Sequence, residues 1–138
     1  EAYLDGGYID DAMHKIEVYQ KIAAVRTNED LEALLDELID RFGEPTKPVL
    51  ALLDIARIKN YARSFGARSI AAKGDALDIT LGEGEKLPLP ALMRLDRAFG
   101  RHVGPLPESD GYRIRLQSKE RREILDTALE VVKMASGE

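Results

Sequence analysis

Residues 46–65 are the stretch that most restricts how this chain folds, because they predict a helix with apolar side chains on nearly every side. Its apolar residues are Val49, Leu50, Leu52, Leu53, Ile55, Ala56, Ile58, Tyr61, Ala62 and Phe65. A helix that is apolar on most sides is usually packed on most sides. We therefore expect this helix at the centre of the fold.

The segment before it predicts another helix, which has one apolar face and one exposed face. Its apolar residues recur at three- and four-residue steps and comprise Leu31, Leu34, Leu35, Leu38 and Phe42. This spacing places them on one side of the helix and leaves Glu37, Asp40 and Arg41 off that side. Glu37 and Arg41 are four residues apart, the spacing at which opposite charges pair on a helix surface. A break at residues 43–45 separates the two helices.

Capping residues indicate where three N-terminal helices begin. Asp10 or Asp11 can accept hydrogen bonds from the free amides at the start of a first helix. Thr27 is the expected N-cap of the second helix, with Asp30 completing a capping box. Thr46 is the expected N-cap of the third helix.

The pattern changes after Gly66, where alternating residues indicate strands. Strands are expected at residues 67–73, at 77–81 and at 112–116, with a brief one at 101–103. Two more helices are expected, one from about Pro88 to Gly100 and a last one over 119–136. Because polar and apolar residues alternate in the strands, we expect an antiparallel sheet with one wet face.

These elements predict an α+β fold, in which an N-terminal three-helix segment packs with a small antiparallel sheet and two further helices. The length of 138 residues predicts a single domain. Within it, residues 1–66 are the helical half and residues 67–138 are the mixed half.

Charge is divided unevenly along the chain. Residues 1–60 carry 13 acidic and 7 basic residues, a net charge of −6, whereas residues 61–138 carry 12 acidic and 13 basic residues, a net charge of +1. Nucleic-acid binding depends on Lys and Arg contacts to phosphates. We therefore expect the helical half to bind basic protein rather than nucleic acid.

Composition also argues against several other classes of protein. The absence of cysteine excludes disulfides, thiol catalysis and cysteine-type zinc sites, and it fits a cytoplasmic protein. No apolar run approaches the ~20 residues that cross a bilayer, and no basic leader is visible. Because the chain starts at Glu1 without a methionine, we expect it to be part of a longer polypeptide.

The candidates for chemistry have simpler explanations. His14 and His102 have no sequence reason to meet, so neither a catalytic triad nor a histidine metal pair is indicated. The acids Asp75, Asp78, Glu83 and Glu85 lack the spacing of a calcium loop, and a solvated hairpin accounts for them better. The basic residues Arg94, Arg97, Arg101, Arg113, Arg115, Lys119, Arg121 and Arg122 lack aromatic residues that would stack on bases.

Two motifs are more specific. The segments YIDDAMHKIEVYQKIA, residues 8–23, and ELIDRFG followed by LLDIARIK, within residues 36–66, lie in this order. They resemble the C-terminal domain of the transcription-repair coupling factor family, which are bacterial DNA translocases. The likeness covers residues 8–66 with specific motifs, and beyond Gly66 it lies in the order of the elements.

The resemblance implies a non-catalytic regulatory domain. In such proteins the C-terminal domain docks on an N-terminal UvrB-like module and masks the surface that binds the excision-repair protein UvrA, until stalled RNA polymerase is engaged. Glu37, Asp40 and Arg41 match the positions with which the family's C-terminal domain grips that module. ATP and Mg²⁺ would belong to motor domains outside these residues, so no cofactor, direct nucleic-acid partner or membrane is expected here.

Two alternatives belong to other classes. A free-standing acidic adaptor could bind another protein through the same helix face, with no self-inhibitory role. A small enzyme would need a pocket that brings His14 or His102 to an acid, and the sequence gives no sign of one.

Overall fold

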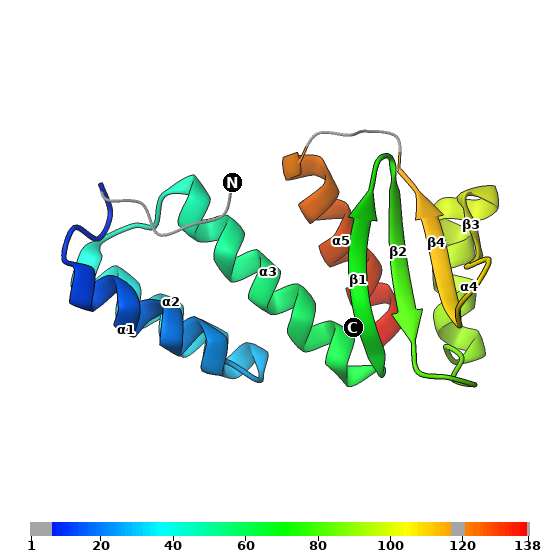
Figure 1. Ribbon diagram of the computed structural model, residues 1–138, viewed down its shortest axis with the longest axis horizontal. Helices are drawn as coiled ribbons and strands as arrows, with labels where there is room; N and C mark the ends of the chain where they lie inside the picture. The colour runs from blue at the N-terminus through cyan, green and yellow to red at the C-terminus, as the bar shows by residue number, and fades with distance from the viewer. Residues whose placement is uncertain (1–6, 117–120, 138) are drawn as a thin grey trace. The chain divides into compact units, whose positions relative to one another are not determined.

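The computed structural model describes residues 7–116 and 121–137, and the side chains of Arg121 and Arg122 lie outside this description. In the described part the order of elements is α1 (Ala12–Ala24), α2 (Asn28–Phe42), α3 (Lys47–Ser64), β1 (Ala67–Lys73), β2 (Ala76–Leu81), α4 (Leu89–Phe99), η1 (Gly100–His102), β3 (Val103–Pro105), β4 (Gly111–Arg115) and α5 (Arg121–Ser136) (Figure 1). Helices followed by an antiparallel sheet with further helices confirm the predicted α+β class.

Contacts divide the chain into two compact units, residues 1–60 and residues 61–138, with the boundary inside α3. The helical unit therefore coincides with the acidic part of the sequence. That the whole chain is one domain stays a prediction. No helix in the described residues is long and apolar enough to cross a membrane.

The first two helices of the helical unit begin at the residues that the capping pattern predicted. The carboxylate of Asp11 accepts hydrogen bonds from the amides of Met13, at 2.8 Å, and His14, at 3.1 Å. Thr27 and Asp30 form the reciprocal capping box at the start of α2. These hydrogen bonds satisfy amides that the helix itself leaves without partners.

The core of the helical unit is apolar and draws on all three helices. It comprises Ile9, Val18, Val25, Leu31, Leu34, Leu38, Val49, Leu53 and Ala56. The apolar stripe predicted for α2 supplies three of these residues, each fully or almost fully buried. Packing of this stripe, rather than helix propensity, is the main source of stability for helices of this length.

The structure corrects one expectation for α3 and agrees with another. The Thr46 hydroxyl is buried and accepts no hydrogen bond within the described residues, so it does not cap the helix. Leu50 is 41% exposed, whereas the other apolar residues predicted for this helix are buried or half-buried. The expectation that the helix is packed on most sides therefore agrees with the structure.

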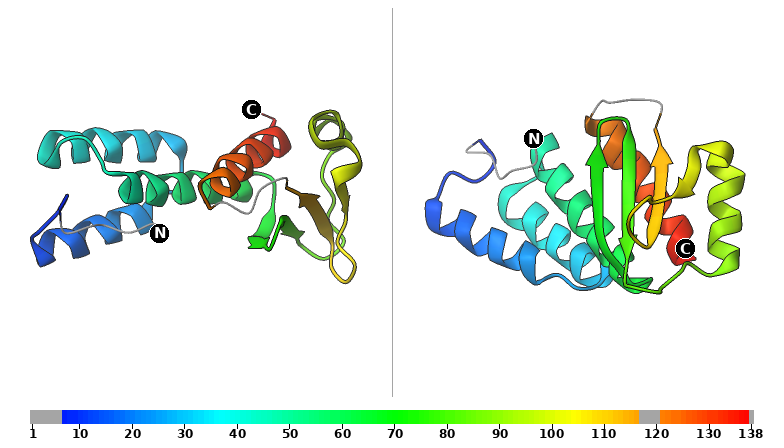
Figure 2. Two further views of the ribbon diagram at one scale, coloured as in Figure 1. Left: turned by 90° about the horizontal axis from the view of Figure 1, so that it is seen from above. Right: turned by 45° about the vertical axis from the view of Figure 1, so that its right-hand side comes forward.

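The second unit is built on a four-stranded antiparallel sheet in the order β1-β2-β4-β3. Helices α4 and α5 lie on the same face of this sheet (Figure 2). Leu77, Ile79 and Ile114 are fully or almost fully buried and form the apolar rows of β2 and β4. Alternation along a strand puts Asp78 and Arg113 on the opposite face from these residues.

Part of that opposite face is buried. This corrects the prediction that Asp78 belongs to a solvated hairpin. Asp78 is 5% exposed and pairs in register with Arg113 across β2 and β4. Two hydrogen bonds join the side chains: Nε to Oδ1 at 2.7 Å and NH2 to Oδ2 at 2.9 Å. The Arg113 guanidinium covers the carboxylate, so a polar residue at an outward position is buried.

A further correction concerns the segment after α4. Residues 100–102 form a short 3₁₀ helix, and the brief strand begins only at Val103, where it pairs with Ile114 of β4. The start of the last helix, predicted near residue 119, lies in a segment outside the described residues.

Candidate protein-docking surface

Four charged side chains link α1 to α2 on the surface of the helical unit. Arg41 donates hydrogen bonds from NH1 to Glu37 and to Glu17, each at 3.0 Å. Lys21 donates to the same Glu37 oxygen and lies 4.0 Å from Glu17. We call this group, Glu17, Lys21, Glu37 and Arg41, the charge seam. Because Glu17 faces Arg41 and Lys21 faces Glu37, the two helices run antiparallel here.

The seam is neither buried nor fully open. Its side chains are between 32% and 44% exposed. Hydrogen bonds from Lys21 and then Arg41 hold the pKa of Glu37 below its usual value. Pairs this exposed are screened by water and salt and contribute little to stability. Their partners can therefore be exchanged at small cost.

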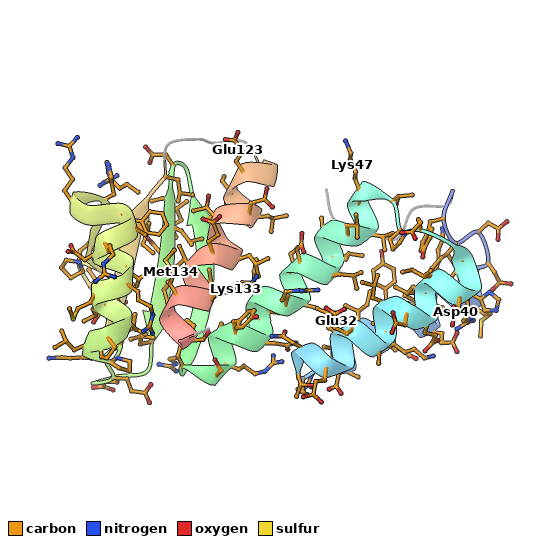
Figure 3. The ribbon with its side chains drawn as sticks, turned by 180° about the vertical axis from the view of Figure 1, so that it is seen from behind. Glu32, Asp40, Lys47, Glu123, Lys133 and Met134 are labelled. Carbon is orange, nitrogen blue, oxygen red and sulfur yellow. The ribbon has the colours of Figure 1, made fainter. Side chains whose placement is uncertain are left out.

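The three residues that the sequence singled out do not form one cluster. Glu37 and Arg41 are joined as their four-residue spacing predicts. Asp40 lies outside the seam: it is exposed, near the end of α2, and no hydrogen bond or ion pair to it is found within the described residues (Figure 3). Asp40 is thus the acid of this trio that is open to a partner.

Sequence reasoning missed the two seam residues that come from α1. Glu17 and Lys21 are four residues apart, so a helical pair between them could have been noticed. Nothing in the sequence showed that this pair would face Glu37 and Arg41, because the contact depends on how α1 packs on α2.

An aromatic cluster fixes the end of α2 that carries Asp40 and Arg41. The Tyr8 hydroxyl donates toward the carbonyl oxygens of Gly43, at 2.7 Å, and Leu38, at 3.2 Å. The Phe42 ring lies 5.8 Å from the Tyr8 ring and 5.9 Å from the His14 ring, between centroids. His14 therefore packs edge-on against Phe42.

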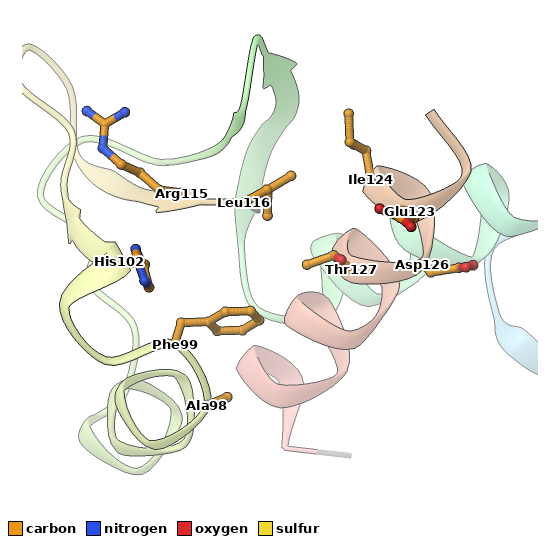
Figure 4. Close-up of a pocket in the computed structure, with 9 residues that line it drawn as sticks. All are labelled: Ala98, Phe99, His102, Arg115, Leu116, Glu123, Ile124, Asp126 and Thr127. Carbon is orange, nitrogen blue, oxygen red and sulfur yellow. The ribbon is translucent and has the colours of Figure 1, made fainter. Parts of the chain in front are cut away.

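The second unit contains a hollow of about 390 Å³ between α4, η1, β4 and α5. His102 lies on the η1 wall, while Glu123 and Asp126 come from α5 on the other side (Figure 4). No hydrogen bond from His102 to either acid is found in the described part of the chain. No group of three or more metal-ligating side chains is found among those residues either.

Three of the eight basic residues considered for nucleic acid have protein contacts in the described part of the chain. Arg113 is held by Asp78, and Arg115 lies 3.9 Å from Asp75. Arg94 donates from Nε to the carbonyl oxygen of Met134 at 2.7 Å. Lys119 and the side chains of Arg121 and Arg122 lie outside the described residues.

Comparison with known proteins identifies the family. A sequence model described as the TRCF domain matches residues 1–92. The chain belongs to the transcription-repair coupling factor family. This confirms the resemblance that the motifs within residues 8–66 indicated.

Individual members of the family are also similar in sequence to this chain. The transcription-repair-coupling factor of Bacillus subtilis is 35% identical over 137 residues, covering 96% of this chain and 12% of the relative. That of Staphylococcus epidermidis is 43% identical over 81 residues, covering 59% of this chain and 7% of the relative. The chain thus spans about an eighth of the length of the Bacillus relative.

A solved structure locates the chain within the family. It is described as the crystal structure of the C-terminal domain of transcription-repair coupling factor, with a TM-score of 0.76 and 30% identity. The match covers 97% of this chain and 86% of that one. The chain therefore corresponds to the family's C-terminal domain, which is not itself a motor domain.

Proposed function

We propose that this chain is a non-catalytic regulatory domain that docks on the N-terminal UvrB-like module of the same polypeptide. Docking masks the surface of that module that binds UvrA and restrains the DNA translocase until stalled RNA polymerase is engaged. The observation that carries the proposal is an exposed acid, Asp40, beside an exchangeable charge seam, in a chain that corresponds to the family's C-terminal domain.

Each of the three residues has its own part in this docking. Asp40 pairs with an arginine or lysine of the module. Glu37 already has two cationic partners and accepts a third or exchanges one. Arg41 keeps Glu37 oriented, a role that the 3.0 Å contact between them supports, and it can meet an acid of the module.

Docking within one polypeptide does not require tight binding. Two surfaces with a separate Kd of about 10 µM, held at an effective concentration of about 1 mM, are closed about 100 to 1. This corresponds to about 2.7 kcal/mol. Such a contact suppresses UvrA binding at rest and still opens when another interaction competes with it.

The test compares two changes of equal charge in the complete polypeptide. Asp40→Lys with Glu37→Lys should weaken docking and raise UvrA binding. Glu123→Lys with Glu130→Lys is the matched control, because these two acids are exposed on α5 of the other unit. Asp40→Lys alone leaves the seam intact and should give part of the effect.

Calorimetry gives a direct reading of the same contact. The 138-residue chain is titrated with the UvrB-like module as a separate fragment, at about 0.1 M and about 0.5 M salt. The proposal is supported if binding of the module weakens at the higher salt concentration and is lost in the Asp40→Lys variant. A folded Asp40 and Glu37 double variant with unchanged UvrA binding would refute it, and the acidic adaptor would then be the better account.

A further inference from the structure

Helix α1 carries no charged residue on the side that faces solvent. Its charged residues are Lys15, Glu17 and Lys21, and it also contains His14. At about 3.6 residues per turn, these four flank the buried side, centred on Val18. The opposite side consists of exposed residues without charge, and we call it the α1 outer face: Ala12, Met13, Ile16, Tyr19, Gln20 and Ala23.

This arrangement is the reverse of an ordinary surface helix. Met13 is 72% exposed, Ile16 is 52% exposed and Tyr19 is 42% exposed. Single exposed apolar residues are common and need no explanation. A helix face without charge that gathers three large exposed apolar side chains around one glutamine is different, because such faces mark contacts with other proteins.

The neighbouring helix has an outer face of opposite character. On α2 the exposed residues that point away from the core include Glu29, Asp36 and Asp40. The charge seam joins the two helices edge to edge, with Glu17 and Lys21 on α1 and Glu37 and Arg41 on α2. The two outer faces therefore border the same seam, one apolar and one acidic.

We propose that the α1 outer face is the apolar part of a docking surface whose acidic part is the outer face of α2. Its occupant is a helix with apolar side chains on one side and Lys or Arg along the adjacent edge. The apolar side lies against Met13 and Ile16, and the basic edge lies over the seam toward Asp40. This occupant follows from charge complementarity, since residues 1–60 have a net charge of −6.

This surface extends the docking on the UvrB-like module proposed above. We assign the basic helix to that module of the same polypeptide, and only this assignment rests on the proposed function. Asp40 and the seam supply orientation and salt dependence. The α1 outer face supplies apolar burial, which does not weaken with salt. The two contributions can therefore be separated by experiment.

The chain offers a matched pair of apolar substitutions. Met13→Gln with Ile16→Gln removes the apolar anchors of α1 without changing charge. Leu89→Gln with Met93→Gln is the control on α4, where the exposures are 68% and 54%, against 72% and 52% on α1. All four side chains are largely exposed, so both variants should fold, as circular dichroism will verify.

The probe is a labelled helical peptide of about 18 residues with leucine along one side and lysine along one edge. Its binding to the 138-residue chain is followed by fluorescence anisotropy at about 0.1 M and about 0.5 M salt. The α1 variant should bind about tenfold more weakly at both salt concentrations, and the α4 variant as wild type. Asp40→Asn should weaken binding at the lower salt concentration only.

Three results would overturn the inference. They are no binding of the lysine peptide, equal binding of a peptide with glutamate in place of lysine, and an α1 variant that binds as well as wild type. Sedimentation adds another: a dimer abolished by Met13→Gln with Ile16→Gln would make the occupant a second copy of this chain.

The same variants are titrated with the UvrB-like module, which separates this inference from the proposed function. If Asp40→Asn weakens module binding and the α1 variant does not, the docking function stands and the apolar surface fails. If the peptide depends on the α1 outer face but the module does not bind, the surface stands and the docking function fails.

Discussion

Two of the arginine–carboxylate contacts between different elements have similar chemistry but carboxylates in opposite surroundings. In the sheet, Arg113 and Asp78 form two hydrogen bonds, and the Asp78 side chain is only 6% exposed. In the helical unit, Arg41 divides one nitrogen between Glu17 and Glu37, whose side chains are 44% and 35% exposed. The two arginine side chains are equally exposed, at 32%, so the contrast lies in the carboxylates: Asp78 is buried and held by two hydrogen bonds, whereas Glu17 and Glu37 share one nitrogen and are partly exposed.

This difference indicates different roles. The buried Asp78 carboxylate already has two hydrogen bonds to Arg113, and removing one member of this pair leaves the other without its counter-charge. A shared, exposed network loses little when a member turns to a partner protein. We infer that the Asp78–Arg113 pair helps to fix the register of β2 and β4, and that the charge seam is the group open to docking. The predictions below test this division.

The largest effect is expected at Gly111, the residue of β4 that lies opposite Thr80 near the Asp78–Arg113 pair. Its φ is +146°, and a Cβ there would lie 2.0 Å from the carbonyl oxygen of Ile79. Gly111→Ala must therefore separate the strands and should cost about 3 kcal/mol or more of unfolding free energy. Urea unfolding followed by circular dichroism measures this loss.

The control for that change is in the next strand. Gly104 pairs with Arg113 from β3, and nothing lies within 4 Å of a Cβ built there. Gly104→Ala should change the unfolding free energy by less than about 1 kcal/mol. Equal losses for the two variants would show that the close approach to the Ile79 carbonyl oxygen is not the cause of the loss at Gly111.

An intermediate effect separates the two carboxylates directly. Asp78→Asn should cost about 2 kcal/mol, because a covered charge-assisted pair loses its negative partner. Glu37→Gln should cost less than about 0.5 kcal/mol, because its contacts are exposed. Both changes preserve side-chain shape. The measurement is therefore the loss of unfolding free energy in each variant relative to the wild type, and the two losses are compared. Comparable losses would contradict the division between a structural pair and an exchangeable seam.

Local chemistry made the helical limits predictable. Asp11, Thr27 and Asp30 act on amides two to four residues away, so the sequence contained both partners of each hydrogen bond. Thr46 had the same pattern, yet its hydroxyl remains without a partner in the described residues. A capping residue indicates where a helix can begin, and packing decides whether its side chain is used.

The contacts that matter most for the candidate site could not be predicted in this way. Glu37 and Arg41 were paired from their spacing, but Glu17 and Lys21 reach them only through the packing of α1 on α2. Asp78 looked solvated because its burial depends on Arg113, 35 residues later in the chain. In both cases the missing information was tertiary, namely which strand or helix lies alongside.

The smallest expected effect is a salt-dependent difference in acid stability. The hydrogen-bonded Arg113 lowers the pKa of Asp78 against the opposing effect of burial, and Lys73 and Arg115 lower it further. Lys21 and Arg41 likewise lower the pKa of Glu37. A carboxyl with a lowered folded-state pKa stabilises the fold above its unfolded pKa, about 4. That contribution is lost as the pH falls through the folded pKa.

As the pH drops below about 4, the unfolding free energy of the wild type should therefore decrease. The decrease should be less steep in Asp78→Asn than in Glu37→Gln, because Asp78→Asn removes the larger of the two pH-dependent contributions. Raising the salt concentration from about 0.1 M to about 0.5 M should remove most of the Glu37 contribution, because its contacts are exposed to screening. The Asp78 contribution should persist, since Arg113 covers that carboxylate. If salt removed both contributions equally, the covered pair would be as open to solvent as the seam, and the contrast between them would not hold.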